Sequence, residues 1–176
     1  MQLSGRRIAI FVAPQFEDLE LWYPRLRLQE AGAEVTVIGP EEGKWRGKQG
    51  TTVESQRAIR ETSSDDFDAL VIPGGYAPDH MRRVPEMIEF VQRMHTAGKP
   101  IAAICHAGWM LASADILEGR RVTSFFSIRA DLVHAGAEWV DAEVVQDGHL
   151  ITSRHPGDLP AFCRAIIAAL TSAQVG

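Results

Sequence analysis

Short apolar segments alternate with longer amphipathic segments along the whole chain. Four segments rich in apolar and β-branched residues predict buried strands over residues 8–12, 34–38, 69–72 and 101–104. Weaker patterns predict a further strand and two hairpins, near residue 122, over residues 44–53 and over residues 144–152. The strands are therefore short and spread over the full length of the sequence.

Apolar residues at helical spacing lie between these strands. From Glu17 onward, Leu19, Trp22, Leu26 and Ala31 recur at this spacing, which predicts a first helix that ends near Gly32. Further helices are predicted over residues 85–97, 107–114, 128–135 and 159–170. We expect the last of these helices to begin with Asp158 as its N-cap.

Strands that alternate with helices are typical of βαβ units. We therefore expect an α/β fold with a mostly parallel sheet and helices on both faces. Residues 1–176 contain no linker, repeat or low-complexity segment, and this length suits one domain. Sites in such sheets form beyond the carboxyl ends of the strands, which directs attention to the loops at residues 14–18, 73–78 and 105–108.

Charge and cysteine content argue against several classes of protein. Eighteen Lys and Arg against 23 Asp and Glu give a formal net charge of −5, so no basic surface favours nucleic acid as a partner. The apolar runs are too short for a membrane span or a signal peptide. Two cysteines without CxxC spacing suit a reducing compartment. We expect a cytoplasmic protein with neither a nucleic-acid nor a membrane partner.

Cys105 is the strongest candidate for chemistry. It lies between the fourth strand and the following helix, with the small residues Ala103 and Ala107 two positions before and after it. A nucleophile elbow has this pattern because its sharp turn tolerates little side-chain bulk. The helix N-terminus that follows favours a thiolate. Cys163 lies among apolar residues of the last helix, and we expect it to be buried and inert.

The two other loops carry glycines and carboxyl groups. Gly74 and Gly75 follow the third strand, and glycines allow backbone N–H groups to approach a substrate oxyanion closely. Glu17 and Glu20 lie about one helical turn apart near the start of the first helix. Either carboxyl group could hydrogen-bond a thiolate or transfer a proton, and acidic residues in a first turn also stabilise the helix dipole.

No pattern in the sequence predicts a metal or a cofactor. The histidines at positions 80, 95, 134 and 149 lack HExxH or comparable spacing. The glycine-rich stretch around Lys48 is too short for a P-loop and lacks its Ser or Thr, and no GxGxxG is present. We therefore expect chemistry that uses protein groups alone.

Four segments together resemble the PfpI branch of the DJ-1/PfpI superfamily, in order and over almost the whole chain. They are FEDLE at residues 16–20, PGG at 73–75, AICH at 103–106 and SRHPGDLP at 153–160. The resemblance implies a flavodoxin-like three-layer sandwich that assembles into a homo-oligomer, as a dimer or a hexamer. It also implies activity as a cysteine peptidase, a glyoxalase or a protein deglycase.

The resemblance further implies roles for individual residues. Cys105 would be the nucleophile and Glu20 its carboxyl partner, with Glu17 close by. The backbone N–H groups of Gly75 and His106 would form an oxyanion hole. In a peptidase, His106 would be the general base, oriented by an acidic residue of a neighbouring subunit, a position that Asp79 occupies here.

Four more residues are expected to contact substrate: Gly74, Trp109, Phe125 and His155. Three positions depart from the pattern of the family. Ala107-Gly108-Trp109 replaces the Gly-Pro that often follows the Cys-His pair, Phe125 stands where some relatives carry a tyrosine, and Asp79 is shorter than the usual glutamate.

Three functions follow from these residues. The first is a cofactor-independent cysteine hydrolase or lyase, with deglycase or glyoxalase activity on methylglyoxal and glyoxal adducts, or with peptidase activity on peptides. The second is a redox-responsive stress protein or chaperone that senses oxidants through Cys105. The third is a binding module that keeps the fold without the chemistry. Lactate formation from methylglyoxal distinguishes the first function from the other two.

Overall fold

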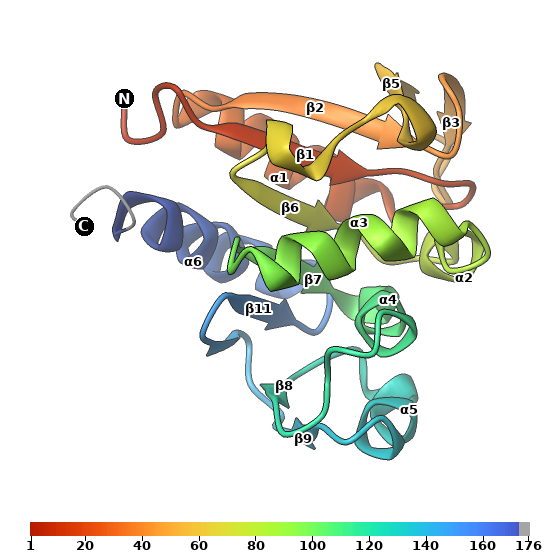
Figure 1. The fold of residues 1–176 in the computed structure, drawn as a ribbon, viewed down its shortest axis with the longest axis vertical. Coiled ribbons are helices and arrows are strands. Elements are labelled where there is room, and N and C mark those ends of the chain that lie inside the picture. The colour runs from red at the N-terminus through yellow and green to blue at the C-terminus, as the bar shows by residue number, and fades with distance from the viewer. Residues whose placement is uncertain (173–176) are drawn as a thin grey trace.

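The computed structural model describes residues 1–172 and contains a seven-stranded sheet at its centre (Figure 1). Its strand order is β10-β11-β7-β6-β1-β2-β5, and every neighbouring pair is parallel except β10 with β11. The strands are β1 (Arg7–Phe11), β2 (Glu34–Gly39), β5 (Arg57–Ala58), β6 (Ala69–Ile72), β7 (Ile101–Ile104), β10 (Val145–Asp147) and β11 (Leu150–Ser153).

Helices cover both faces of this sheet (Figure 1). On one face α1 (Asp18–Glu30) packs against α6 (Leu159–Ser172), and on the other α3 (Pro85–Thr96) lies over β6 and β7. The central strands β6 and β7 are buried along their whole length, as continuous apolar strands between two helical layers must be. The expected α/β, flavodoxin-like architecture with a mostly parallel sheet is confirmed.

Shorter elements lie at the carboxyl edge and at one end of the sheet. The hairpin of β3 (Gly43–Arg46) and β4 (Thr52–Ser55) was expected. The remaining elements are α2 (Ala77–Met81), α4 (Gly108–Ser113), α5 (Arg129–His134) and the parallel pair β8 (Arg121–Val122) and β9 (Glu138–Trp139). Neither α2 nor β5 was predicted, because five and two residues are too short to show a period.

The apolar residues that recur at helical spacing in α1 are not all on its buried face. Leu19 is 56% exposed and Leu26 is 58% exposed, whereas Leu21 and Leu28 are fully buried. The helix carries two apolar stripes, and its hydrophobic periodicity does not choose between them. The stripe that contains Leu21 faces the sheet, which also turns Glu20 inward.

The expected cap of the last helix is wrong. The Asp158 carboxyl group accepts hydrogen bonds from the backbone and the guanidinium of Arg154 and not from the start of α6. Residues Pro156–Asp158 form a 3₁₀ turn ahead of the helix. A buried carboxylate favours a charged donor over a neutral amide because the charged hydrogen bond is stronger.

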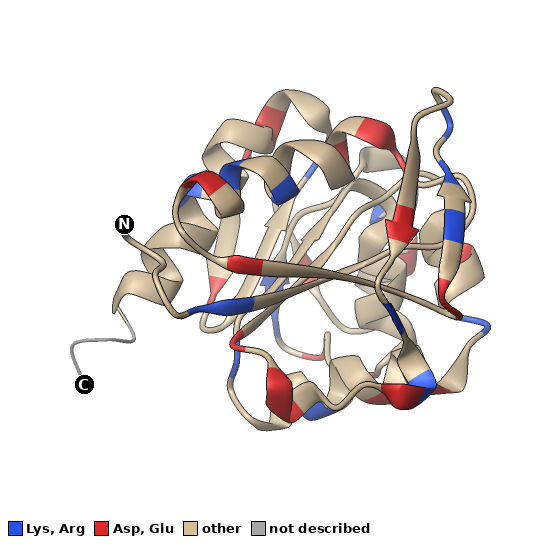
Figure 2. Cartoon of the chain, turned by 90° about the horizontal axis from the view of Figure 1, so that it is seen from above, with Lys and Arg blue, Asp and Glu red and all other residues tan. Residues whose placement is uncertain are grey.

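Acidic and basic side chains both occur over most of the chain (Figure 2), whereas β3 carries only basic ones, Lys44 and Arg46. Within residues 1–172 no helix is both long enough and apolar enough to cross a membrane.

The two leucine stripes of α1 make an internal comparison possible. Leu28→Ala should lower the free energy of unfolding by about 2–5 kcal/mol, because it opens a cavity in the core. Leu26→Ala should change it by no more than about 0.5 kcal/mol, because that side chain is mostly exposed. Urea denaturation of both variants measures the difference, and equal losses would contradict the observed orientation of α1.

Candidate active site

The three candidate loops meet because β1, β6 and β7 are neighbours in the sheet and run in the same direction. Their carboxyl ends therefore lie at one edge, where sites of open parallel sheets form. A single β-bridge between Phe16 and Gly75 joins the first loop to the second, and the Glu17 N–H donates to the Gly74 carbonyl at 3.1 Å. The three loops thus form one connected surface.

Cys105 occupies a strained backbone conformation at the turn between β7 and α4. Its φ is +63°, in the left-handed region that side chains other than glycine rarely adopt. The Cys105 side chain is buried, and the backbone N–H groups of Gly75 and His106 lower the pKa of its thiol. Both groups thus favour negative charge on the sulfur, as an oxyanion-type site requires.

The structure separates the roles of the two glutamates. Glu17 is the N-cap of α1, and its carboxyl group accepts a hydrogen bond from the Glu20 N–H at 3.2 Å. Glu20 is fully buried beside Cys105, and its Oε1 accepts a hydrogen bond from the Gly74 N–H at 2.9 Å. Its Oε2 is buried without a geometrically satisfactory partner in the described residues. A proton on Oε2 would remove the cost of a buried, unpaired negative charge.

Glycine is required at both positions of the second loop. A Cβ on Gly74 would lie 2.6 Å from Glu20 Oε1 and 2.8 Å from Cys105 Cβ, so no side chain fits there. Gly75 has a φ of +79°, and a Cβ there would lie 2.5 Å from the Gln15 carbonyl oxygen. The close approach of acid to thiol therefore depends on the absence of a side chain at Gly74.

Burial controls the ionisation of both groups. Burial, and then the charge of Glu17, raises the pKa of the Glu20 carboxyl to about 8, so Glu20 is protonated at neutral pH. Burial, and then negative charge on Glu20, raises the pKa of the Cys105 thiol to about 12. Since Glu20 is neutral at pH 7, the thiol does not face that negative charge when it loses its proton.

His106 is placed to receive that proton. Its Nδ1 lies 3.2 Å from Cys105 Sγ, and its Nε2 lies 3.3 Å from Ser127 Oγ. Burial, and then the charge of Lys48, lowers the pKa of His106, which leaves the ring neutral at pH 7. The ring stacks on Phe125 with centroids 5.1 Å apart, so it is held from its face as well as from its edge.

A cavity of about 320 Å³ opens over Cys105. Its lining combines the predicted site residues with three that the sequence did not indicate. It is formed by Glu17, Glu20, Lys48, Gly75, Tyr76, Cys105, His106, Phe125, His155 and Pro156. A small molecule of a few heavy atoms fits a space of this size.

Three predicted site residues lie outside the cavity lining. Gly74 lies behind Cys105 and contributes through its N–H to Glu20. Trp109 packs its edge against the His106 ring and donates from Nε1 to Asp131 Oδ2 at 2.8 Å, so it supports the histidine from behind. Asp79 lies on α2 and pairs with Arg83 of the same chain, and a role across subunits stays a prediction.

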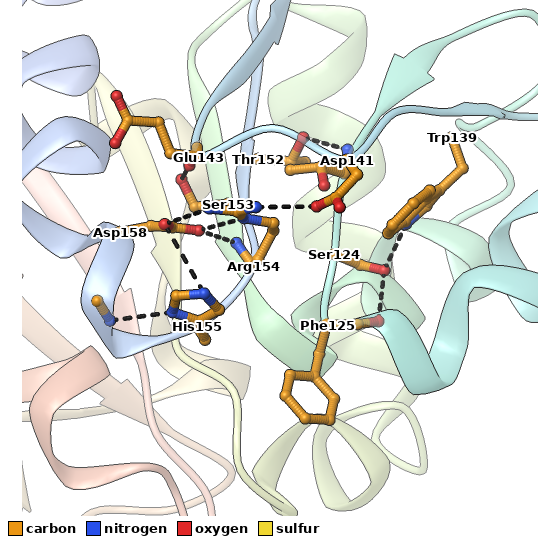
Figure 3. A network of polar contacts seen from close by, with 12 residues as sticks. Ser124, Phe125, Trp139, Asp141, Glu143, Thr152, Ser153, Arg154, His155 and Asp158 are labelled. Atoms are coloured by element: carbon orange, nitrogen blue, oxygen red, sulfur yellow. Dashed lines mark hydrogen bonds and ion pairs between the residues drawn. The ribbon is translucent and has the colours of Figure 1, made fainter.

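One side of the cavity is held by a polar network (Figure 3). Arg154 binds Asp158 through two guanidinium nitrogens, at 2.9 and 3.0 Å, and reaches Asp141 at 2.8 Å. His155 Nδ1 accepts from the Gly157 N–H at 3.1 Å, while its Nε2 lies 4.0 Å from Asp158 Oδ1. The network thereby positions His155 at the edge of the cavity.

A second branch of the network positions Phe125 (Figure 3). Ser124 accepts from Trp139 Nε1 at 2.9 Å and donates to the Phe125 carbonyl at 2.9 Å. The Phe125 N–H donates to the Cys105 carbonyl at 3.2 Å, which ties this segment to the elbow. The Phe125 ring then faces His106.

Lys48, Tyr76 and Pro156 are the cavity residues that sequence reasoning missed. Lys48 lies in the turn between β3 and β4, which is separate from the main sheet. The sequence could have indicated two of them, because Tyr76 directly follows Gly75 and Pro156 belongs to the fourth segment that resembles the family. Among residues 1–172 no group of three or more His, Cys, Asp or Glu side chains could hold a metal ion.

A cysteine on a strained turn at the carboxyl edge of a flavodoxin-like sheet, beside a buried acid, defines a class of α/β proteins built on a cysteine elbow. The model of the DJ-1/PfpI family matches residues 6–169, and the chain belongs to this family. The resemblance predicted from the sequence is thus confirmed.

Curated relatives of similar length carry the name deglycase. Deglycase PfpI of Pyrococcus furiosus is 46% identical over 164 residues, which are 93% of this chain and 99% of the relative. Protein/nucleic acid deglycase 2 of Escherichia coli is 40% identical over 169 residues, which are 94% of this chain and 98% of the relative.

A solved structure has the same fold. It is that of a two-domain protein of Anabaena variabilis with DJ-1/ThiJ/PfpI-like and ferritin-like domains, with a TM-score of 0.93 and 42% identity. The match covers 94% of this chain and 48% of that one, so this chain spans about half the length of the Anabaena protein.

The raised pKa of Glu20 predicts a pH dependence of stability. Its pKa is raised from an ordinary value of 4.5 to about 8, so between these values the folded protein holds a proton that the unfolded chain has released. Stability should therefore fall as pH rises through this window, by up to about 1.4 kcal/mol per pH unit. Urea denaturation from pH 5 to 8 measures the slope.

Glu20→Gln should remove this slope, because the amide does not titrate. Glu42→Gln makes the same formal charge change at an exposed position and should keep it. If wild type and Glu20→Gln show the same slope, Glu20 is not protonated in the folded protein.

Proposed function

We propose that this protein is a cofactor-independent deglycase that removes small 2-oxoaldehyde adducts from amines and thiols, with Cys105 as its nucleophile. The observation that carries the proposal is the position of Cys105 between a protonated Glu20 and a neutral His106 at the base of a small cavity. The deglycase names of relatives that match almost the whole chain support the same activity.

The first step activates the thiol. The Cys105 proton passes to His106 Nδ1 over 3.2 Å, in the tautomer that carries its proton on Nε2. The thiolate that forms accepts hydrogen bonds from the backbone N–H groups of Gly75 and His106. Ser127 accepts from the protonated Nε2 and stabilises the imidazolium.

The reaction of a methylglyoxal adduct then proceeds by displacement. The thiolate attacks the carbinol carbon of the adduct, the C–N bond breaks, and the amine leaves with the proton from His106. The enzyme now holds a hemithioacetal, Cys–S–CH(OH)–CO–CH₃. Transfer of a proton between its two oxygen-bearing carbons through an enediol, with Glu20 or His106 as the acid–base group, gives the lactoyl thioester.

Water completes the reaction. It attacks the thioester carbon, the C–S bond breaks, and lactate leaves while Cys105 regains its proton. Over the whole cycle the adduct and one water give the free amine and lactic acid, with no oxidant or reductant consumed. The Gly75 and His106 N–H groups would meet the oxyanion of this tetrahedral step, which is the role expected for them from the sequence.

The cavity favours a small adduct over a peptide chain. At about 320 Å³ it accommodates a three-carbon fragment together with the end of a side chain. Asp79, the residue expected to orient His106 in a peptidase, pairs with Arg83. We therefore place peptidase activity behind deglycase activity. A homo-oligomer, dimer or hexamer, stays a prediction that sedimentation velocity tests.

Loss of the nucleophile tests the proposal. Wild type should form lactate from methylglyoxal and release N-acetyl-lysine from its glycated form. Cys105→Ser should lower both rates by about a thousandfold or more, because a hydroxyl gives up its proton to His106 far less readily than a thiol and is a weaker nucleophile. Cys163→Ser, at the buried cysteine of α6, is the matched control and should retain both rates.

A wild-type protein that forms no lactate and leaves glycated amines unchanged would overturn the proposal. So would equal activity of Cys105→Ser and wild type.

Oxidant sensing is a second candidate, favoured by the same groups around sulfur. Two N–H donors and a protonated Glu20 would also hold the oxygens of a Cys105 sulfinate. Mild peroxide, as the oxidant, should then add two oxygens at Cys105 and none at Cys163. Intact mass and peptide mapping measure this, and equal oxidation of the two cysteines would remove the candidate.

A further inference from the structure

Lys48 is a cationic group in the cavity that none of the steps above employs. Among residues 1–172, Lys48 is the only Lys or Arg that lines this cavity. No Asp or Glu of residues 1–172 forms an ion pair with the Lys48 ammonium group. Its Nζ lies 5.2 Å from the centroid of the Tyr76 ring, at the rim of the cavity. The ammonium group is therefore free to bind an anion in the cavity.

The turn that carries Lys48 is fixed by a buried carboxylate. Asp18 is 4% exposed and accepts hydrogen bonds from the Gln49 N–H at 2.7 Å, the Thr51 N–H at 2.9 Å and the Thr51 hydroxyl at 2.5 Å. These charge-assisted bonds are strong. A Cβ on Gly47 would lie 2.6 Å from the same carboxyl group, which shows how closely the turn is held.

A second set of contacts connects this turn to the oxyanion loop. The Lys48 N–H donates to the Phe16 carbonyl at 2.9 Å, and Phe16 forms the β-bridge with Gly75. Lys48 is thus joined through one residue to a donor that faces the sulfur. Its backbone cannot shift without moving the first loop of the site.

The ammonium group acts on the reacting atoms from this position. Its positive charge lowers the pKa of the Cys105 thiol and of the Glu20 carboxyl, against the larger effect of burial. The same charge lowers the pKa of His106, so it acts on all three ionisable groups around the sulfur.

The proposed reaction creates an anion in the same place. Hydrolysis of the thioester converts a neutral acyl group on sulfur into a carboxylate, in a cavity that also contains the carboxyl group of Glu17. The product carboxylate and the Glu17 carboxylate repel each other within one cavity, so the product is stabilised by a cation beside it.

We propose that Lys48 is the anion-binding residue of this cavity and that its ligand is the carboxylate of a 2-hydroxy acid, the product of the reaction. The proposal rests on the proposed function. It makes lactate and glycolate ligands of the resting protein and competitive inhibitors of turnover, and it gives the turn between β3 and β4 a role in selecting the substrate class.

The test compares lactate with lactamide, its uncharged analogue, by calorimetry. Wild type should bind lactate more tightly than lactamide, by about five- to tenfold, as expected for a partly solvated ion pair. Lys48→Met, which keeps most of the length of the side chain without its charge, should bind the two ligands equally. Lys48→Arg should restore the preference for lactate.

Lys44→Met is the matched control. Lys44 is an exposed lysine of the same hairpin that does not line this cavity, so its loss should leave the preference for lactate unchanged. Thermal unfolding of each variant checks that the hairpin remains folded.

A second measurement needs only the wild-type protein. Lactate should slow the alkylation of Cys105 by iodoacetamide, and lactamide at the same concentration should not. An equal effect of the two ligands, or a lactate preference that survives Lys48→Met, would overturn the proposal.

The two proposals fail separately. Lactate formation with no preference for lactate over lactamide removes the role of Lys48 and leaves the deglycase. A preference that depends on Lys48 in a protein that forms no lactate removes the deglycase, and with it the assignment of the ligand as a product.

Discussion

The site depends on the close approach of three chain segments at the carboxyl edge of the sheet. Gly74 lies between the Glu20 carboxyl group and the Cys105 side chain, where even a methyl group would lie within 3 Å of both. The Gly74 N–H then supplies the hydrogen bond that orients the acid. Since the carboxyl group is buried beside the sulfur, the energy of its charge is controlled by burial. The acid is therefore neutral at neutral pH, a condition on which both the proposed displacement and the proposed sensing chemistry depend.

Support for the site extends well behind the atoms that react. Trp109 packs edge-on against the His106 ring and Phe125 stacks on it. Trp109 is held in turn by a hydrogen bond to Asp131, and the Phe125 carbonyl by one from Ser124. The Arg154 and Asp158 pair holds the segment that ends in His155 (Figure 3). A cavity with such supports keeps its shape without a ligand, and little binding energy is lost in ordering it.

Much of this arrangement was predictable from the sequence. Residues that follow adjacent parallel strands must meet at one edge, so Cys105, Gly75 and the glutamates of the first loop could be grouped before any coordinates. The choice between Glu17 and Glu20 could not be made, because it depends on which stripe of α1 packs on the sheet. Lys48 was missed because the β3–β4 hairpin lies outside the main sheet, and no periodicity relates it to the strands. Trp109 was misplaced because its indole N–H is engaged behind the histidine, a contact with a residue 22 positions away.

The separation of that hairpin from the main sheet has an evolutionary consequence. Cys105, Gly75 and His106, with their proposed roles, belong to loops at the ends of central strands, and Glu20 belongs to the buried side of α1, so a substitution at any of them disturbs the core. The turn at residues 47–51 is joined to the site by Asp18, by a few backbone contacts and by the contact of Lys48 with the Tyr76 ring. Its exposed side chains can therefore drift while the reaction chemistry stays constant. If Lys48 has its proposed role, substitutions in this hairpin change which molecules are accepted without changing the residues around the sulfur.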